Sequence, residues 1–267
     1  MSSSGHRPTK SIIFAFDDCR HLAGCAHGHN LHRSIVASSA VSLVSTANNR
    51  VKLGGVSALK KTDELPLLST TPVAWGASAL ADPIALLIDH AFLEMKAALN
   101  AMDLLTRWPN EWTPGWVEAM TSVARDEASH LAQVTRLLIR RGGKMERGHK
   151  SYYASDLRRL VRNGKTTETL DRLLVSGLIE ARSCERFAVL ASVAEDAELG
   201  AFYKALHSSE MGHYKVFLKM AHKVAPKDEV DDRWQVLLAA EAKIIEAQPP
   251  GCRIHSGFSD VSVSNAN

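Results

Sequence analysis

The sequence predicts an all-α protein organised around a four-helix bundle. Four long stretches repeat their apolar residues at helical spacing, and no segment of the body alternates as a strand does. Proline or glycine stands at the ends of several of these stretches, as at helix boundaries. The chain of 267 residues is 45% hydrophobic and 23% charged, which is the composition of a globular protein with a sizeable core.

Each expected helix is marked by its boundaries. The first begins at a proline, which is favoured in the first helical turn, and the second ends before Gly142-Gly143. The fourth ends at Pro226, because proline is disfavoured inside a helix. The expected helices cover residues 83–105, 113–141, 167–193, 197–225 and, as a shorter fifth, 232–247.

The lengths of the connections predict the topology. Short connections join the first helix to the second and the third to the fourth, so both pairs should be antiparallel hairpins. About 25 residues separate the second helix from the third. Four helices with one long central crossover form the ferritin-like arrangement. We therefore expect a ferritin-like four-helix bundle with an extra short C-terminal helix.

The two ends of the chain differ from the body in expected order and in charge. We expect a disordered N-terminal extension over residues 1–75, the bundle domain over 76–258 and a disordered tail over 259–267. Residues 1–61 hold eight Lys and Arg against two acids, so the formal net charge of +3 arises in the extension. A basic extension with few acids is typical of organelle transit peptides, and organelle targeting is the alternative to the cytoplasmic location that we expect.

Cysteine and hydropathy patterns exclude two further classes of protein, disulfide-stabilised scaffolds and membrane-spanning proteins. Four cysteines are too few for a disulfide framework, and no apolar run reaches the roughly 18 residues of a membrane span. A cysteine–histidine cluster in the extension offers zinc ligands, although its spacing matches no common finger. Its members are Cys19, His21, Cys25, His27, His29 and His32.

Each long helix carries an acidic residue in the middle of an apolar stripe. Two of these acids belong to Glu-x-x-His pairs, whose spacing puts both side chains on one helix face. The other two long helices each supply one further glutamate. This order of ligands is typical of a carboxylate-bridged two-metal site in a bundle core. The candidate metal ligands are Glu94, Glu127, His130, Glu180, Glu210 and His213.

Electrostatics favours metal at this place. Buried carboxylates are costly unless they are paired or coordinated, and mixed carboxylate and imidazole ligands suit iron or manganese better than copper. Glu185 is the competing ligand on the third helix, but it lies about 140° around the helix from Glu180. Asp126 is expected to support a ligand histidine, with a plain surface acid as the alternative. His90 and Cys184 are expected to pack beside the ligands without binding metal.

A basic window covers the end of the second helix and the crossover. Residues 136–165 hold ten Lys and Arg against two acids, with Tyr152 and Tyr153 among them. Cations with interleaved aromatic rings suit an RNA backbone and a splayed-out base. The alternative is that some of these cations complement a helix C-terminus. The candidate nucleic-acid contacts are Arg140, Arg141, Lys144, Arg147, Lys150, Arg158, Arg159 and Arg162.

The body of the chain resembles the MiaE family of tRNA hydroxylases from about residue 80 to Phe258. The stretches that carry the resemblance are Leu87–Ala91, Glu94–Ala98, Glu127–His130, Gly177–Phe187 and Arg253–Gly257. The resemblance implies a ferritin-like, oxygen-dependent di-iron enzyme. It hydroxylates the isopentenyl group of 2-methylthio-N6-isopentenyladenosine at position 37 of tRNA.

The resemblance also implies a set of cofactors and partners. These are two iron ions, dioxygen as co-substrate, an external electron-donor protein or reductase, and the anticodon arm of tRNA. The family's iron ligands fall on the six residues that the bundle pattern selects. Small side chains on the first and third helices are expected to leave room for the isopentenyl chain, namely Ala97, Ala98, Ala101 and Gly177.

Three other functions fit parts of the same pattern. A different ferritin-like di-iron oxygenase or peroxidase would use the same ligands on a small molecule. An iron-storage protein would need a shell-forming assembly. A metal-free bundle that binds RNA would use the basic window alone.

Overall fold

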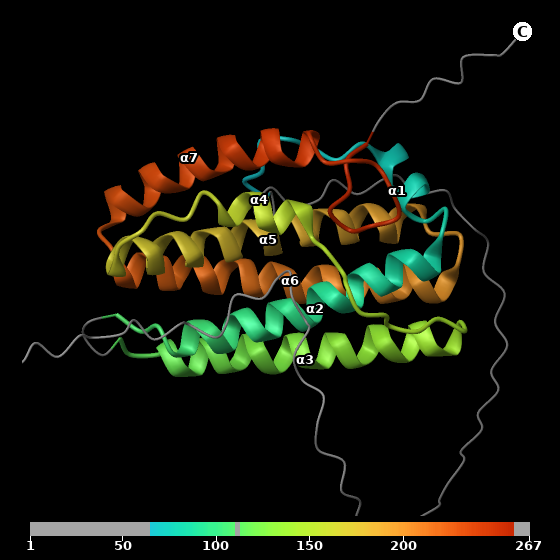
Figure 1. The fold of residues 1–267 in the computed structure, drawn as a ribbon, viewed down its shortest axis with the longest axis horizontal. Helices are drawn as coiled ribbons and strands as arrows, with labels where there is room; N and C mark the ends of the chain where they lie inside the picture. The colour runs from blue at the N-terminus through green and yellow to red at the C-terminus, as the bar shows by residue number, and fades with distance from the viewer. Residues whose placement is uncertain (1–64, 110–112, 259–267) are drawn as a thin grey trace, which may run out of the picture. The chain divides into compact units, whose positions relative to one another are not determined.

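A computed structural model of the chain describes residues 65–109 and 113–258, which form seven helices and no strand (Figure 1). The all-α class expected from the sequence is therefore confirmed. The helices are α1 (Val73–Ala79), α2 (Pro83–Leu105), α3 (Trp116–Arg140), α4 (Tyr152–Arg158), α5 (Lys165–Val193), α6 (Ala197–Val224) and α7 (Lys227–Glu246). The cysteine–histidine cluster and the expected tail lie outside the described residues.

Two antiparallel hairpins build the bundle. Helix α2 packs along α3, and α5 packs along α6 (Figure 1). The crossover between the hairpins carries α4, which lies between α5 and α7. Helices α2, α3, α5 and α6 thus form the ferritin-like bundle with one long crossover, and α7 packs on the α5 side.

Local signals set the helix boundaries. Asp82 caps α2, because its side chain accepts a hydrogen bond from the Ala85 amide. Asp196 caps α6 in the same way, through the Leu199 amide. Gly142 follows α3 with a φ of 81°, a left-handed conformation that glycine adopts without strain and that ends a helix.

The apolar core has two halves with a polar layer between them. One half surrounds Trp116 and Phe217, and the other surrounds Trp75 and Tyr203. In each helix of the bundle, the candidate metal ligands lie in the sequence between the residues of the first half and those of the second. The fold therefore places the polar residues at mid-height in the bundle.

Two short helices differ from the sequence-based expectation. Helix α1 lies partly inside the expected extension, and Trp75, which was expected to be disordered, is fully buried against Arg186. Thr71 also donates a 2.6 Å hydrogen bond to Glu185. The ordered body thus begins before residue 76. Helix α4 is only seven residues long, too short to show a period.

Among the described residues, no single helix is long and apolar enough to cross a bilayer. Helices α1 and α2 reach the required length and hydropathy only when taken together, and they meet at a bend of 99°.

A buried ion pair joins three elements of the fold. Arg182 on α5 contacts Glu241 on α7 through two hydrogen bonds of 2.8 and 2.9 Å, and both side chains are fully buried. The hydroxyl of Tyr153 on α4 donates a further 2.9 Å bond to the same carboxylate. This network fixes the crossover and α7 on α5.

We predict that Glu241→Ala lowers the free energy of unfolding by about 3–5 kcal/mol, because Arg182 loses its fully buried carboxylate partner and keeps only the partly exposed Glu185. Urea unfolding followed by circular dichroism measures this change. The matched control is Lys227→Ala, which removes an exposed ion pair with Asp231 on the same helix and should cost less than about 0.5 kcal/mol. A loss below about 1 kcal/mol for Glu241→Ala would contradict the role of this pair.

Candidate metal centre

The six candidate metal ligands meet in the polar layer of the bundle. Each is at most 6% exposed. Helices α2 and α3 supply Glu94, Glu127 and His130, whereas α5 and α6 supply Glu180, Glu210 and His213. Because all four helices run through the same core, ligands far apart in the sequence converge.

The ligand atoms form two overlapping groups. The first contains Glu94 and His130, the second contains Glu180 and His213, and both contain Glu127 and Glu210. Within each group the ligand atoms lie within 4.8 Å of one another. The arrangement can hold two adjacent metal ions, with the two shared glutamates between them.

Unsatisfied atoms in the cluster show that it fits metal. Among the described residues, Glu127 Oε1, His130 Nδ1 and Glu210 Oε1 are buried without a hydrogen-bond partner. They nevertheless lie close to atoms of opposite charge. Glu127 Oε1 is 2.6 Å from His213 Nδ1, and His130 Nδ1 is 3.2 Å from Glu210 Oε1. Two divalent ions would balance four carboxylates, and the Glu and His donor set suits iron. The fold and this cluster thus fit a di-iron centre.

The pKa values in the cluster are strongly shifted. Burial and the Glu210 charge raise the pKa of Glu127 to about 8, and burial raises the pKa of Glu180 well above its ordinary value. Burial by itself would lower the pKa values of His130 and His213. Contacts with the carboxylates outweigh burial and raise the pKa to about 12 for His130 and about 10 for His213. Protons therefore balance part of the carboxylate charge at neutral pH.

The residues around the ligands have distinct surroundings. His90 Nε2 lies 2.6 Å from Glu94 Oε1, and burial lowers the pKa of His90 to about 4, so its ring is neutral at pH 7. Asp126 is 39% exposed and its Oδ2 is 3.7 Å from His213 Nε2, which is too long for a direct hydrogen bond. Glu185 turns away from the cluster to bind Thr71, as its position around α5 predicts. Cys184 is fully buried in the core.

A pocket beside the cluster opens between α2, α4 and α5. It encloses about 850 Å³ with its open mouth included. Its floor includes carboxylates of both ligand groups, among them Glu94 and Glu180. Its walls are mainly apolar and are formed by Leu93, Ala97, Val161, Val175, Ile179 and Phe187. An apolar group in this pocket would lie directly against the metal ligands.

Only one of the four small residues expected beside the substrate lines this pocket. Ala97 does so, whereas Ala98 does not. Ala101 is buried in the apolar core, and a side chain at Gly177 would face Phe217 on α6. Gly177 thus lies on the side of α5 that contacts α6.

The eight candidate tRNA contacts do not form one patch. Arg140 and Arg141 pair with acids at the start of α6, at one end of the bundle. Arg162 pairs with Asp171 near the start of α5, at the other end (Figure 1). Lys144 pairs with Glu146, Arg159 pairs with Asp156, and Arg147 and Lys150 are exposed. Arg158 lines the pocket that leads to the ligands.

The sequence does not single out two cations that line the same pocket. These are Lys96 on α2 and Arg172 on α5. A signal for Arg172 does exist, because Arg172, Ser176 and Glu180 follow one another at spacings of four residues on one helix face. Lys96 lies only two residues from Glu94 and has no such pattern.

Comparisons with known proteins agree with this site. Residues 58–256 match the family model described as tRNA-(MS2IO6A)-hydroxylase (MiaE). The tRNA 2-(methylsulfanyl)-N(6)-isopentenyladenosine(37) hydroxylase of Pseudomonas putida is 41% identical over 188 residues, 70% of this chain and 90% of that protein. The hydroxylase of the same name from Salmonella typhimurium is 32% identical over 146 residues, 55% of this chain and 53% of that protein.

A solved structure is similar as well. It is described as protein 43 with aldehyde deformylating oxygenase activity from Synechococcus. The two structures superpose with a TM-score of 0.67 at 38% sequence identity. The match covers 73% of this chain and 98% of the other.

We predict that single ligand substitutions separate the two metal positions. Glu94→Ala removes a ligand from one group and should leave about one metal per chain, whereas Glu127→Ala removes a shared ligand and should leave less than one. Elemental analysis of protein purified with iron measures the ratio. Glu185→Ala is the control and should keep about two metals per chain. Equal metal loss from Glu94→Ala and Glu127→Ala would contradict the shared role of Glu127.

We also predict that metal uptake releases protons. The pKa values of Glu127, His130 and His213 are raised above 7, so these groups bind protons at pH 7 and must lose them to bind metal. Affinity for Mn²⁺ should therefore increase from pH 6 to pH 8, with about two to three protons released per two ions at pH 7. Titration calorimetry in buffers of different ionisation enthalpy counts these protons. Binding without proton release would refute this assignment.

Proposed function

The chain belongs to the MiaE family of tRNA hydroxylases, and we propose that it hydroxylates the isopentenyl group of 2-methylthio-N6-isopentenyladenosine at position 37 of tRNA. The observation that carries this proposal is the apolar pocket whose floor is formed by the ligand carboxylates. The isopentenyl group is the apolar, flexible part of this nucleoside. Such a pocket takes the chain and leaves the nucleoside's polar atoms nearer the surface.

The site residues have separable tasks in this reaction. When bound, the di-iron centre supplies the activation of dioxygen, with electrons from an external donor protein or reductase. Glu94, Glu127, His130, Glu180, Glu210 and His213 hold the two ions. Leu93, Val175 and Ile179 exclude water around the isopentenyl chain and position its terminal carbon toward the ligands.

The candidate tRNA contacts have different surroundings. Arg147 and Lys150 are exposed on the crossover, Arg158 lines the pocket, and all three suit the anticodon arm. Arg140 and Arg141 are engaged by Asp196 and Glu198. Cations that already bind carboxylates gain less from a phosphate, so we expect Arg147 and Lys150 to contribute more of the affinity than Arg140 and Arg141.

A second candidate function comes from the solved relative. The protein from Synechococcus is described as having aldehyde deformylating oxygenase activity, and the apolar walls of the pocket in this chain suit an apolar aldehyde. This chain would then act on a small apolar molecule at the same ligands. A tRNA substrate and an aldehyde substrate are separated by offering both to the same purified protein.

We predict that expressing this chain in a host that makes 2-methylthio-N6-isopentenyladenosine adds one oxygen atom to that nucleoside. Mass spectrometry of digested tRNA detects the added oxygen. Glu127→Ala should abolish the product because it removes a shared ligand, whereas Lys227→Gln, on the exposed start of α7, should leave the product unchanged. Unmodified nucleoside from wild-type protein with two bound irons would refute the proposal, and turnover of a long-chain aldehyde by that protein would support the second function.

A further inference from the structure

The pocket beside the ligands has an open side and an enclosed end. Along α5 it is lined in turn by Arg172, Ser176, Glu180, Ser183 and Phe187. Arg172 is partly exposed, whereas Ser183 and Phe187 are at most 8% exposed. The pocket therefore continues past the ligand carboxylates into the core.

Contacts between α2 and α5 follow the same direction. Asn100 on α2 donates a 2.9 Å hydrogen bond to the Ser176 hydroxyl, toward the open side. At the enclosed end, the ring centroids of His90 and Phe187 are 5.0 Å apart. Glu180 lies between these two levels along α5. The ligand layer thus separates the open side of the pocket from its enclosed end.

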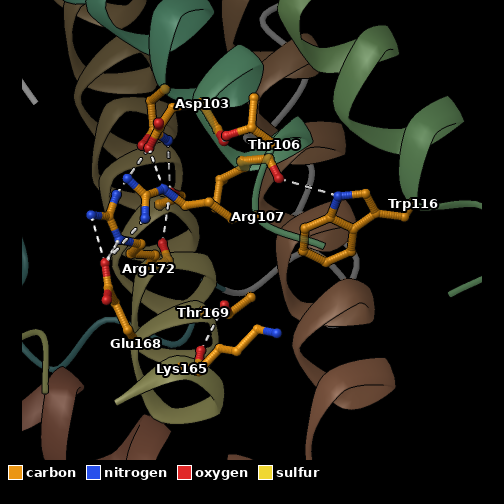
Figure 2. A network of polar contacts seen from close by, with 11 residues as sticks. Asp103, Thr106, Arg107, Trp116, Lys165, Glu168, Thr169 and Arg172 are labelled. Atoms are coloured by element: carbon orange, nitrogen blue, oxygen red, sulfur yellow. Dashed lines mark hydrogen bonds and ion pairs between the residues drawn. The ribbon is translucent and has the colours of Figure 1, made fainter. Parts of the chain in front are cut away.

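The cation on the open side of α5 already has partners. Arg172 donates hydrogen bonds to Asp103 at 3.1 Å and to Glu168 at 2.8 Å, as Figure 2 shows. It precedes Glu180 by eight residues, which is about 12 Å along the helix axis. Arg172 is therefore anchored two helical turns away from the ligands.

The enclosed end holds a polar pair from distant parts of the chain. Ser183 Oγ lies 3.1 Å from His255 Nε2, and both residues line the pocket. Ser183 follows Glu180 by three residues, so the two side chains lie on one face of α5. The pair formed by Ser183 and His255 therefore adjoins the ligand layer.

The fold fixes His255 in the pocket wall. The residues on both sides of it are bound to the body of the protein. The Ile254 amide donates a 2.9 Å hydrogen bond to Asp89 Oδ2 on α2, and Trp75 Nε1 on α1 donates a 3.0 Å bond to Ser256 Oγ. The segment after α7 thus contributes a rigid side chain to the enclosed end.

The pair can form further hydrogen bonds. Among the described residues, His255 Nδ1 is buried without a hydrogen-bond partner. Burial and the charges of Arg186 and Arg182 lower the pKa of His255 well below its ordinary value, so its ring is neutral at pH 7. A neutral imidazole and a hydroxyl can each donate one hydrogen bond and accept another. Since a buried polar atom without a partner is costly, a ligand hydroxyl at this end would be stabilising.

We propose that Ser183 and His255 bind the hydroxyl group that the reaction places on the isopentenyl chain. This inference rests on the proposed function and names the residues that recognise its product. A chain that enters from the open side and ends at the ligand carboxylates has its terminal carbon one helical turn from the pair. A hydroxyl on that carbon finds a donor and an acceptor there, whereas the methyl group of the substrate can use neither.

The test compares the binding of two fluorescent anticodon stem-loops. One carries 2-methylthio-N6-isopentenyladenosine, and the other carries the same nucleoside with the hydroxylated chain. The protein has its metals bound, and no electron donor is present. We expect the wild type to bind the hydroxylated stem-loop roughly five- to tenfold more tightly, since it gains hydrogen bonds in a buried site.

The decisive variant is Ser183→Ala, which should bind both stem-loops with equal affinity. His255→Phe should do the same, because it keeps an aromatic ring against Tyr153 but removes both nitrogens. The matched control is Ser192→Ala, which changes an exposed serine of the same helix and should keep the wild-type preference. Each result is a ratio of two affinities for one protein, so a general loss of binding does not imitate it.

Two outcomes would overturn the inference. The wild type could bind both stem-loops equally, or the preference could persist in Ser183→Ala, which would place the hydroxyl on the metal ions or on His90. Thermal melting checks the fold of His255→Phe, and Ser183→Ala decides the matter if that variant does not fold. Failure of the proposed function gives a different result, because the wild type would then leave the isopentenyl stem-loop unhydroxylated when an electron donor is added.

Discussion

Repulsion among four buried carboxylates is the constraint on which the rest of this structure depends. Glu94, Glu127, Glu180 and Glu210 lie in one layer and divide the apolar core into two halves. Each half must stabilise the bundle while the layer between them opposes it, since buried charges are costly without partners. Protons on the two histidines offset part of the repulsion, and two divalent ions would offset it fully.

Ion pairs around the layer hold the helices where apolar contact is interrupted. Arg140 and Arg141 join α3 to the start of α6 at one end, and Arg172 with Asp103 joins α5 to α2 on the other side of the layer. The ion pair between Arg182 and Glu241 attaches α7 to α5. These pairs position the two hairpins while leaving the pocket between α2 and α5 open.

Regular patterns made the long helices and the ligands predictable from the sequence. The Glu-x-x-His pairs lie in apolar stripes, and helical spacing alone selects the face on which Glu94 and Glu180 lie. Helices α1 and α4 have seven residues each, which is too few for a period to appear. The position of Lys96 in the pocket wall could not be predicted, for a related reason. Whether Lys96 faces solvent or a groove depends on the helix packed opposite, which no local pattern records.

The division of the ligands between hairpins has a consequence for assembly. The α2–α3 hairpin supplies three ligands of one metal group, and the α5–α6 hairpin supplies three of the other. Each group is completed by a glutamate from the opposite hairpin. A metal ion held by either group would therefore link the two hairpins through a shared glutamate. Metal binding and closure of the bundle across its two hairpins would thus favour one another on this geometry.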